Sequence, residues 1–249
     1  MDGFVKRRAA APAGLFAAEA AGLAWLRVPG GAPVVEVLEL ADDSITVSRV
    51  RPVAATAEAA RLFGARLAVT HNAGAEAFGA PPTGFTGPSF IADLPMSTDP
   101  ARAWGAFYAE QRLAPYARLA AGELGSRGLA VVDALAARLT AGAFDDDAPP
   151  ARLHGDLWSG NVLFGPVGAT LIDPSAHGGH RLTDLAMLAL FGAPHLDAVF
   201  QGYEEASTSL PDGWRELIGL HQVYPLLVHA ALFGGGYGRT AVARAADYL

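Results

Sequence analysis

Residues suited to catalysis are concentrated between His154 and Asn161, a stretch that reads His-Gly-Asp-Leu-Trp-Ser-Gly-Asn and is soon followed by Asp173. Asp156 and Asn161 are five positions apart in a glycine-containing loop. An aspartate can orient and deprotonate an attacking hydroxyl, while an asparagine and a second aspartate can hold Mg²⁺ against phosphates. The pattern predicts phosphoryl transfer from a magnesium nucleotide, with Asp156 as the base and Asn161 and Asp173 as metal ligands. A polar loop whose side chains only cap turns is the alternative without chemistry.

A predicted hairpin brings the second aspartate to this loop. Residues 162–164 and 169–172 have the pattern of two short strands around a turn that contains glycine and proline. Antiparallel pairing across that turn puts Asn161 opposite Ile172, one step from Asp173. We therefore expect the amide and the carboxylate to meet at the open end of the hairpin.

A transition-metal hydrolase is a rival interpretation of the same region. Histidine and carboxylate side chains suit such ions, and five of them are available: His154, Asp156, Asp173, His177 and His180. The last two lie in a glycine-rich loop rather than one turn apart on a helix. Phosphoryl transfer, which already employs both aspartates, is the favoured interpretation.

Four motifs together resemble one known family. They are the His154–Asn161 loop, Ile172-Asp-Pro174, residues 179–187 and Leu190-Phe-Gly192. The chain is similar, over most of its length, to the fructosamine kinase (ketosamine kinase) family, a branch of the aminoglycoside-phosphotransferase-like kinases. The resemblance implies an α+β, bilobal, protein-kinase-like fold, with a small sheet-containing N-lobe in residues 1–50 and a larger, mostly helical C-lobe in residues 51–249.

The same resemblance implies an activity. A family member would use ATP and Mg²⁺ to phosphorylate a sugar hydroxyl of a ketosamine, either small or protein-linked, which is a deglycation repair activity. It would place His229 beside the substrate, and it would make His154 and Asp184 structural supports of the loop. Trp158, two residues past the proposed base, is expected to lie against the sugar or the protonated amine of the substrate. A kinase of an aminoglycoside or amino alcohol, and a catalytically weak nucleotide-binding protein, remain as alternatives.

Lys6 and Glu19 are predicted to form an ion pair. Glu19 lies among apolar residues at helical spacing, where a carboxylate is costly unless a cation meets it. Lys6 is the only lysine among 18 basic residues and follows a short apolar strand. In kinases, a strand lysine held by a helix glutamate contacts the nucleotide phosphates. By resemblance, Lys6 and Glu19 take these roles.

The remainder of the N-lobe is expected to contain two more strands, at residues 33–40 and 44–50. Arg49 and Val50 then fall where kinases place the hinge that binds adenine. Only five residues precede Lys6, whereas a Gly-rich loop on two strands precedes this lysine in kinases. We expect the N-lobe to be truncated by about 30 to 40 residues, the alternative being nucleotide binding without that cover.

The C-lobe is predicted to be mostly helical. Expected helices cover residues 56–71, 104–113, 129–139, 185–191 and 214–233, the last kinked near Pro225. Asp184 is expected either to cap its helix or to anchor the catalytic loop. Residues 72–100 form a long loop whose Phe85 segment is expected to line the substrate side. His221 and His229 resemble polar family positions at the substrate cleft, with an ordinary core role as the alternative.

Composition restricts the partners. A net charge of −7 and a pI near 5.4 argue against nucleic acid. The chain has no cysteine, which fits a reducing compartment. The basic, alanine-rich N-terminus could pass for a secretion signal of a secreted binding module, but Pro12 and Glu19 weaken that pattern, and no other stretch is expected to span a membrane. We expect a cytoplasmic enzyme, and the sequence carries no signal for its oligomeric state.

Overall fold

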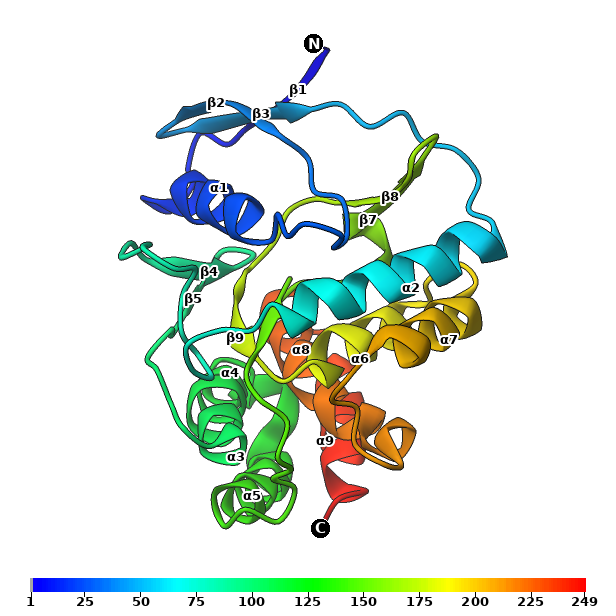
Figure 1. Ribbon diagram of the computed structural model, residues 1–249. Coiled ribbons are helices and arrows are strands. Elements are labelled where there is room, and N and C mark those ends of the chain that lie inside the picture. The colour runs from blue at the N-terminus through cyan, green and yellow to red at the C-terminus, as the bar shows by residue number, and fades with distance from the viewer. Residues whose placement is uncertain (1) are drawn as a thin grey trace.

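Three short strands near the N-terminus pair into one antiparallel sheet at the top of the molecule (Figure 1). The computed structural model describes residues 2–249. Strand β3 (Ser44–Ser48) is central, with β1 (Gly3–Arg7) and β2 (Val37–Ala41) at the edges. The predicted strand at 33–40 begins later than expected, because Val34 forms a bridge to Leu171 and ties this sheet to a distant hairpin.

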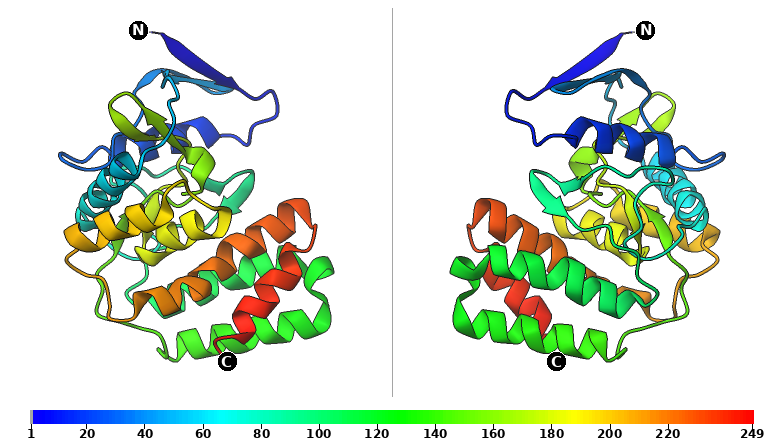
Figure 2. Two further views of the ribbon diagram at one scale, coloured as in Figure 1. Left: turned by 90° about the vertical axis from the view of Figure 1, so that its right-hand side faces the viewer. Right: turned by 90° about the vertical axis from the view of Figure 1, so that its left-hand side faces the viewer.

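Helix α1 (Leu15–Trp25) lies against the sheet, as Figures 1 and 2 show. Phe16 and Leu23 of α1 pack with Val35, Ile45 and Val47 in a small apolar core. The apolar residues whose helical spacing predicted this helix therefore form its buried face.

The predicted hairpin next to the candidate catalytic loop, His154–Asn161, is confirmed. Strands β7 (Val162–Gly165) and β8 (Gly168–Leu171) pair with Phe164 opposite Ala169. The Ile172 N–H donates to the carbonyl of Asn161 at 3.1 Å, which extends the register to the residue before Asp173. The 3-10 turn η2 (Ser159–Asn161) leads into this hairpin.

Two further strand pairs were not predicted. Strand β6 (Ala151–Leu153) pairs with β9 (His177–Gly179), so the segments before and after the catalytic loop run side by side. Within the expected loop 72–100, strands β4 (Ser89–Ile91) and β5 (Leu94–Met96) form a hairpin. The proline in β5 and the glycines nearby are unfavourable in strands, so the sequence pattern does not indicate a hairpin here.

The large body of the protein is helical, as expected. Its elements are α2 (Ala57–Asn72), α3 (Trp104–Phe107), the π-helix η1 (Tyr108–Leu113), α4 (Ala114–Leu119), α5 (Ala121–Thr140), α6 (Leu182–Phe191), α7 (Leu196–Ala206), the 3-10 helix η3 (Trp214–Leu217), α8 (Ile218–Phe233) and α9 (Tyr237–Ala246). The Thr56 hydroxyl caps α2 by accepting from the Ala59 N–H at 3.1 Å. The predicted helix at 129–139 is the second part of the longer α5.

The structure distinguishes the two roles that the sequence left open for Asp184. Helix α6 begins at Leu182, and Asp184 lies in its first turn without capping it. The Asp184 side chain is buried and hydrogen-bonds to the catalytic loop instead. The second of the two predicted roles, that of loop anchor, is the one that this geometry supports.

Residues 214–233 are long and apolar enough by composition to cross a membrane, with a mean hydropathy of 1.2. This differs from the expectation that no stretch beyond the N-terminus has that character. Within the fold, 56% of its most apolar 18-residue window is buried, and α8 packs against α6 and α9. The apolar composition therefore matches that of a core helix.

Helices α2 and α7 approach each other at two glycines. A Cβ at Gly64 would lie 1.9 Å from the carbonyl oxygen of Val199, and one at Gly202 would lie 1.9 Å from that of Arg61. Both contacts involve backbone, which cannot rotate away as a side chain can. Close packing of these helices therefore requires glycine at both positions.

We predict that Gly64→Ala lowers the free energy of unfolding by about 2 to 3 kcal/mol, because the added methyl group forces the two helices apart. Gly122→Ala on α5 is the matched control, since a Cβ there meets nothing within 4 Å. It should be neutral or stabilising by up to about 1 kcal/mol. Urea denaturation measures both, and equal stability of the two variants would contradict this packing.

Candidate active site

The predicted pair between Lys6 and Glu19 is present. Lys6 Nζ lies 2.9 and 2.7 Å from the two carboxylate oxygens of Glu19 and 2.8 Å from Oδ1 of Asp173. Burial lowers the pKa of Lys6, but attraction by Glu19 and Asp173 outweighs it and leaves the pKa raised. Lys6 is therefore protonated at neutral pH, and its ammonium group connects β1 and α1 to Asp173, just after the β7–β8 hairpin.

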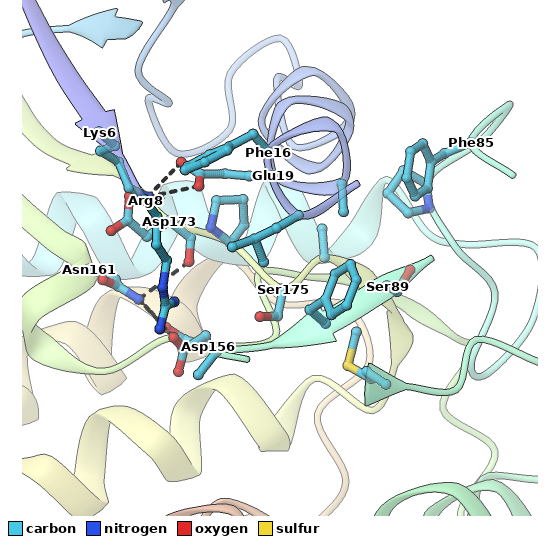
Figure 3. Close-up of a pocket in the computed structure, with 18 of the residues that line it drawn as sticks. Lys6, Arg8, Phe16, Glu19, Phe85, Ser89, Asp156, Asn161, Asp173 and Ser175 are labelled. Carbon is cyan, nitrogen blue, oxygen red and sulfur yellow. Dashed lines mark hydrogen bonds and ion pairs between the residues drawn. The ribbon is translucent and has the colours of Figure 1, made fainter. Parts of the chain in front are cut away.

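Asn161 links the other two acidic groups. Its amide nitrogen donates to the Asp156 carbonyl at 2.8 Å, to the Asp156 carboxylate at 3.2 Å and to the Asp173 carbonyl at 3.4 Å (Figure 3). All three bonds use Nδ2, and within residues 2–249 the amide oxygen accepts none. The structure thus brings Asp156, Asn161 and Asp173 together, with the Asn161 oxygen available to a ligand.

Asp173 has a left-handed backbone, with φ of 55°. This conformation is uncommon outside glycine and costs of order 1 kcal/mol, although aspartate tolerates it better than most residues. The turn follows β8 directly and precedes Pro174, and the carboxylate meets Lys6. The ion pair with Lys6 helps to offset the local strain.

A buried hydrogen-bond network holds the loop before Asp156. The Asp184 carboxylate accepts the backbone N–H groups of His154 at 2.8 Å and Gly155 at 3.0 Å, and it pairs with His71 at 3.1 Å. Burial alone would raise the pKa of Asp184, but the hydrogen bond from His71 and its charge, together with the His154 ring and the Gly155 N–H, leave it lowered. His71, a buried residue at the end of α2, also bonds to the Tyr203 hydroxyl at 2.6 Å.

His154 connects the loop to the hairpin. Its Nε2 lies 2.8 Å from the Ile172 carbonyl, an acceptor, so this nitrogen carries the proton. Burial lowers the pKa of His154 and keeps the ring neutral. Its Nδ1 then accepts the Asp156 N–H at 3.2 Å. The structural role predicted for His154 agrees with this geometry.

Burial raises the pKa of Asp156 to about 7. The hydrogen bond from Asn161 lowers the pKa, whereas the charges of Asp173 and Asp184 add to the increase. A carboxylate with a pKa near neutrality is well suited to take a proton from a hydroxyl, because it is both available and sufficiently basic.

A cavity of about 600 Å³ contains these groups. Its polar end is formed by Lys6, Glu19, Asp156, Asn161 and Asp173, and it continues past Ser175 and Ser89 to the aromatic rings of the 85–90 segment (Figure 3). The expectation that the Phe85 segment lines this side agrees with the structure. The sequence analysis did not identify Arg8, Ser89 and Phe90 as cavity residues. Arg8 could have been found from the two-residue alternation of an extended strand, which puts it on the same side as Lys6.

A second cavity of about 210 Å³ shares Ala92, Asp156 and Trp158 with the first. Most of its other walls are apolar, and they come from three places: Ile91, Met187, and the stretch of α8 from Tyr224 to Phe233. Trp158 is 42% exposed, and its ring lies over Gly160, where a Cβ would come within 2.2 Å of it. Asp156 thus stands where the two cavities meet.

His229 lines the second cavity, whereas His221 lines neither. His229 Nδ1 lies 2.8 Å from the Pro225 carbonyl, and burial lowers the pKa of the ring. A neutral ring that donates through Nδ1 leaves Nε2 as an acceptor. His221 is buried against Trp104 and bonds to the Thr183 hydroxyl, so the core alternative holds for it.

Several predicted residues lie elsewhere. Arg49 pairs with Asp2, and Val50 packs against the core under the small sheet. Neither residue lines either of the two cavities described above, and their hinge role stays a prediction. His177 bonds to the Ser175 carbonyl, and His180 to Asp146. These two histidines thus have partners other than the predicted metal ligands Asn161 and Asp173.

Comparison with known proteins gives consistent results. The profile of the fructosamine kinase family matches residues 1–249. The probable ketoamine kinase YniA of Escherichia coli K12 is 37% identical over 150 residues, which are 57% of this chain and 50% of that protein. This match spans only about half the length of the curated relative.

Solved structures agree with this result. A candidate fructosamine-3-kinase from Thermobifida fusca YX-ER1 has a TM-score of 0.89 and 49% identity, over 98% of this chain and 84% of that chain. Macrolide 2′-phosphotransferase MphH from Brachybacterium faecium, at 18% identity over 93% of this chain and 79% of its own, has a TM-score of 0.56. The predicted α+β, protein-kinase-like fold is confirmed.

The raised pKa of Asp156 predicts a pH-dependent penalty on stability. The pKa of an unfolded aspartate is about 3.9, so between that value and about 7 the folded chain holds a proton that the unfolded chain releases. Stability contributed by this group is therefore lost as pH rises through this range. Asp156→Asn cannot ionise and should be more stable than the wild type at pH 8, by about 1 to 3 kcal/mol.

Urea denaturation of the metal-free protein between pH 4 and 8 measures this difference, which should shrink towards pH 4. Asp133→Asn, on an exposed face of α5, is the control and should follow the wild type. If the free energy of unfolding depended on pH in the same way in Asp156→Asn and in the wild type, burial would not raise the pKa of Asp156.

Proposed function

The chain belongs to the fructosamine kinase family, and from that premise we propose that it transfers the γ-phosphoryl group of ATP to a sugar hydroxyl of a ketosamine. The observation that carries this proposal is the meeting of Asp156, Asn161, Asp173 and Lys6 in one cavity. A base, two oxygen ligands and a phosphate-binding cation are the parts that phosphoryl transfer requires.

The oxygen ligands suit Mg²⁺. The Asn161 amide oxygen accepts no hydrogen bond among the described residues, and only one Asp173 carboxylate oxygen is paired with Lys6. Hard oxygen donors of this kind are those that Mg²⁺ prefers. Asn161 and Asp173 would hold the ion, which supplies charge neutralisation at the phosphates when bound.

Asp156 performs the proton transfer in this proposal. Its carboxylate accepts the proton of the sugar hydroxyl while the hydroxyl oxygen bonds to the γ-phosphorus. The bond from that phosphorus to the β,γ-bridging oxygen breaks, and ADP leaves with the bond's electron pair. Lys6, held by Glu19, stabilises phosphate charge. We also keep Arg49 and Val50 as the adenine-binding hinge between two lobes, residues 1–50 and 51–249.

The second cavity is our candidate for the amine side of the acceptor. Its lining includes neither lysine nor arginine, and two of its polar groups, Asp156 and His229, can accept hydrogen bonds. The amine of a ketosamine is protonated at neutral pH, so it would find acceptors and the face of Trp158 there. Phe233, at the wall, is 66% exposed, which leaves room for a free or a protein-linked amine to extend outwards. A cytoplasmic location stays a prediction.

The first test is magnesium-dependent ATP consumption with ribulose- and fructose-derived lysine adducts, beside an aminoglycoside and an amino alcohol. The wild type should turn over the adducts, and Asp156→Asn should lower kcat by about 10² to 10⁴ because the base is lost. Normal folding of the variant, checked by circular dichroism, is the control. Turnover of the aminoglycoside in place of the adducts, or equal activity of the variant, would contradict the proposal.

We further expect Trp158→Ala to reduce kcat/KM for a ketosamine about fivefold or more, which corresponds to a cation-π contact of order 1 kcal/mol. Trp158→Phe keeps an aromatic face and should lose less. The KM for ATP should stay the same in both variants. Wild-type kinetics in Trp158→Ala would show that the ring does not contact the acceptor.

A further inference from the structure

Arg8 is a second basic residue in the cavity that contains the candidate catalytic groups. Lys6 and Arg8 are two positions apart, at and just beyond the end of β1, and alternation along an extended chain puts them on one side. Both line the cavity with Asp156 and Asp173, and Figure 3 shows both side chains entering it. Arg7, between them, also borders the cavity, but its side chain is 70% exposed and lies 3.7 Å from Asp43, outside the group of catalytic candidates.

The charge of Lys6 is already balanced by protein carboxylates. Its ammonium contacts Glu19 and Asp173, so two negative charges meet one positive charge. Asp156 adds a third carboxylate to the same end of the cavity. A nucleoside triphosphate bound there would be stabilised by a further cation, because the negative charge of its phosphates in a partly buried site needs nearby hydrogen-bond donors.

Arg8 is held away from such a role by one exposed partner. Its two terminal nitrogens bond to the two carboxylate oxygens of Asp93, at the turn between β4 and β5. The side chains are 49% and 39% exposed, and an ion pair of this kind contributes only about 0 to 1 kcal/mol. A phosphate group offers the same bidentate geometry with more charge, so exchange of partners is favourable.

We propose that Arg8 is a phosphate-binding residue that leaves Asp93 for the γ-phosphate of the bound nucleotide. This inference rests on the proposed function, because it takes ATP as the ligand of the cavity. In this scheme Asp93 competes with the nucleotide for the guanidinium. Removal of the arginine and removal of its partner must therefore change nucleotide affinity in opposite directions.

The experiment measures the affinity of magnesium-free and magnesium-bound ATP and ADP by calorimetry, with no acceptor present. Arg8→Gln should weaken ATP binding about 5- to 30-fold and ADP binding less than 3-fold, because only ATP carries the γ-phosphate. Asp93→Asn should tighten ATP binding about 2- to 5-fold. Arg61→Gln is the matched control, since Arg61 pairs with Glu205 at similar exposure and lines neither cavity.

Opposite shifts for Arg8→Gln and Asp93→Asn, with Arg61→Gln unchanged, would support the proposal. Shifts in the same direction would show that the pair only clamps the β4–β5 hairpin, and an equal loss for ATP and ADP would exclude the γ-phosphate; either result overturns it. If ATP binding depends on Lys6 but not on Arg8, this inference alone fails. If the wild type binds no ATP, the proposed function fails as well.

Discussion

The buried carboxylate of Asp184 is the interaction on which the candidate active site depends. A charged group with no exposure to solvent must be compensated by donors, and here two of the donors are N–H groups of the catalytic loop itself. The loop is thereby tied to α6 at His154 and Gly155. His154 passes the constraint on, because its ring bonds to the carbonyl of Ile172 and accepts from the N–H of Asp156. One anchored loop thus fixes both the candidate base and the backbone before Asp173.

Beyond this anchor, the site contains features that oppose stability. Asp173 adopts a left-handed conformation, and burial raises the pKa of Asp156 to about 7. Both become understandable if the groups act on a ligand, since strain and shifted pKa values persist only where the surroundings hold them in place. The surroundings here are Lys6, which binds Asp173, and Asn161, which donates to both aspartates. The hydrogen bonds around Asp184 make the loop rigid enough to hold Asp173 in its left-handed conformation and Asp156 in its buried position.

Local chemistry was sufficient to predict much of this arrangement. The register of the β7–β8 hairpin follows from strand alternation on either side of a glycine turn, and the Lys6–Glu19 pair follows from a carboxylate at an apolar helix position. The β4–β5 hairpin was missed, because its strands are three residues each and their pairing is decided by packing against the helical body. The role of Asp184 was left open between cap and anchor, since the partners that decide it are 29 and 30 residues away. Sequence reasoning thus succeeded where the partner was nearby or chemically demanded, and failed where tertiary contacts chose it.

The distribution of charge on the two sides of Asp156 follows from the same framework. Basic residues Lys6, Arg7 and Arg8 line only the larger cavity, and they do so because β1 ends at its rim. The smaller cavity is built mainly from α8 and the β4–β5 hairpin, and the described residues that line it offer apolar surface and the acceptors Asp156 and His229 but no lysine or arginine. An anionic donor and a cationic acceptor would therefore be drawn to opposite sides of a single carboxylate. Such a separation brings the proposed substrates together at the base while disfavouring each in the place of the other, which is a source of specificity that needs no additional contact.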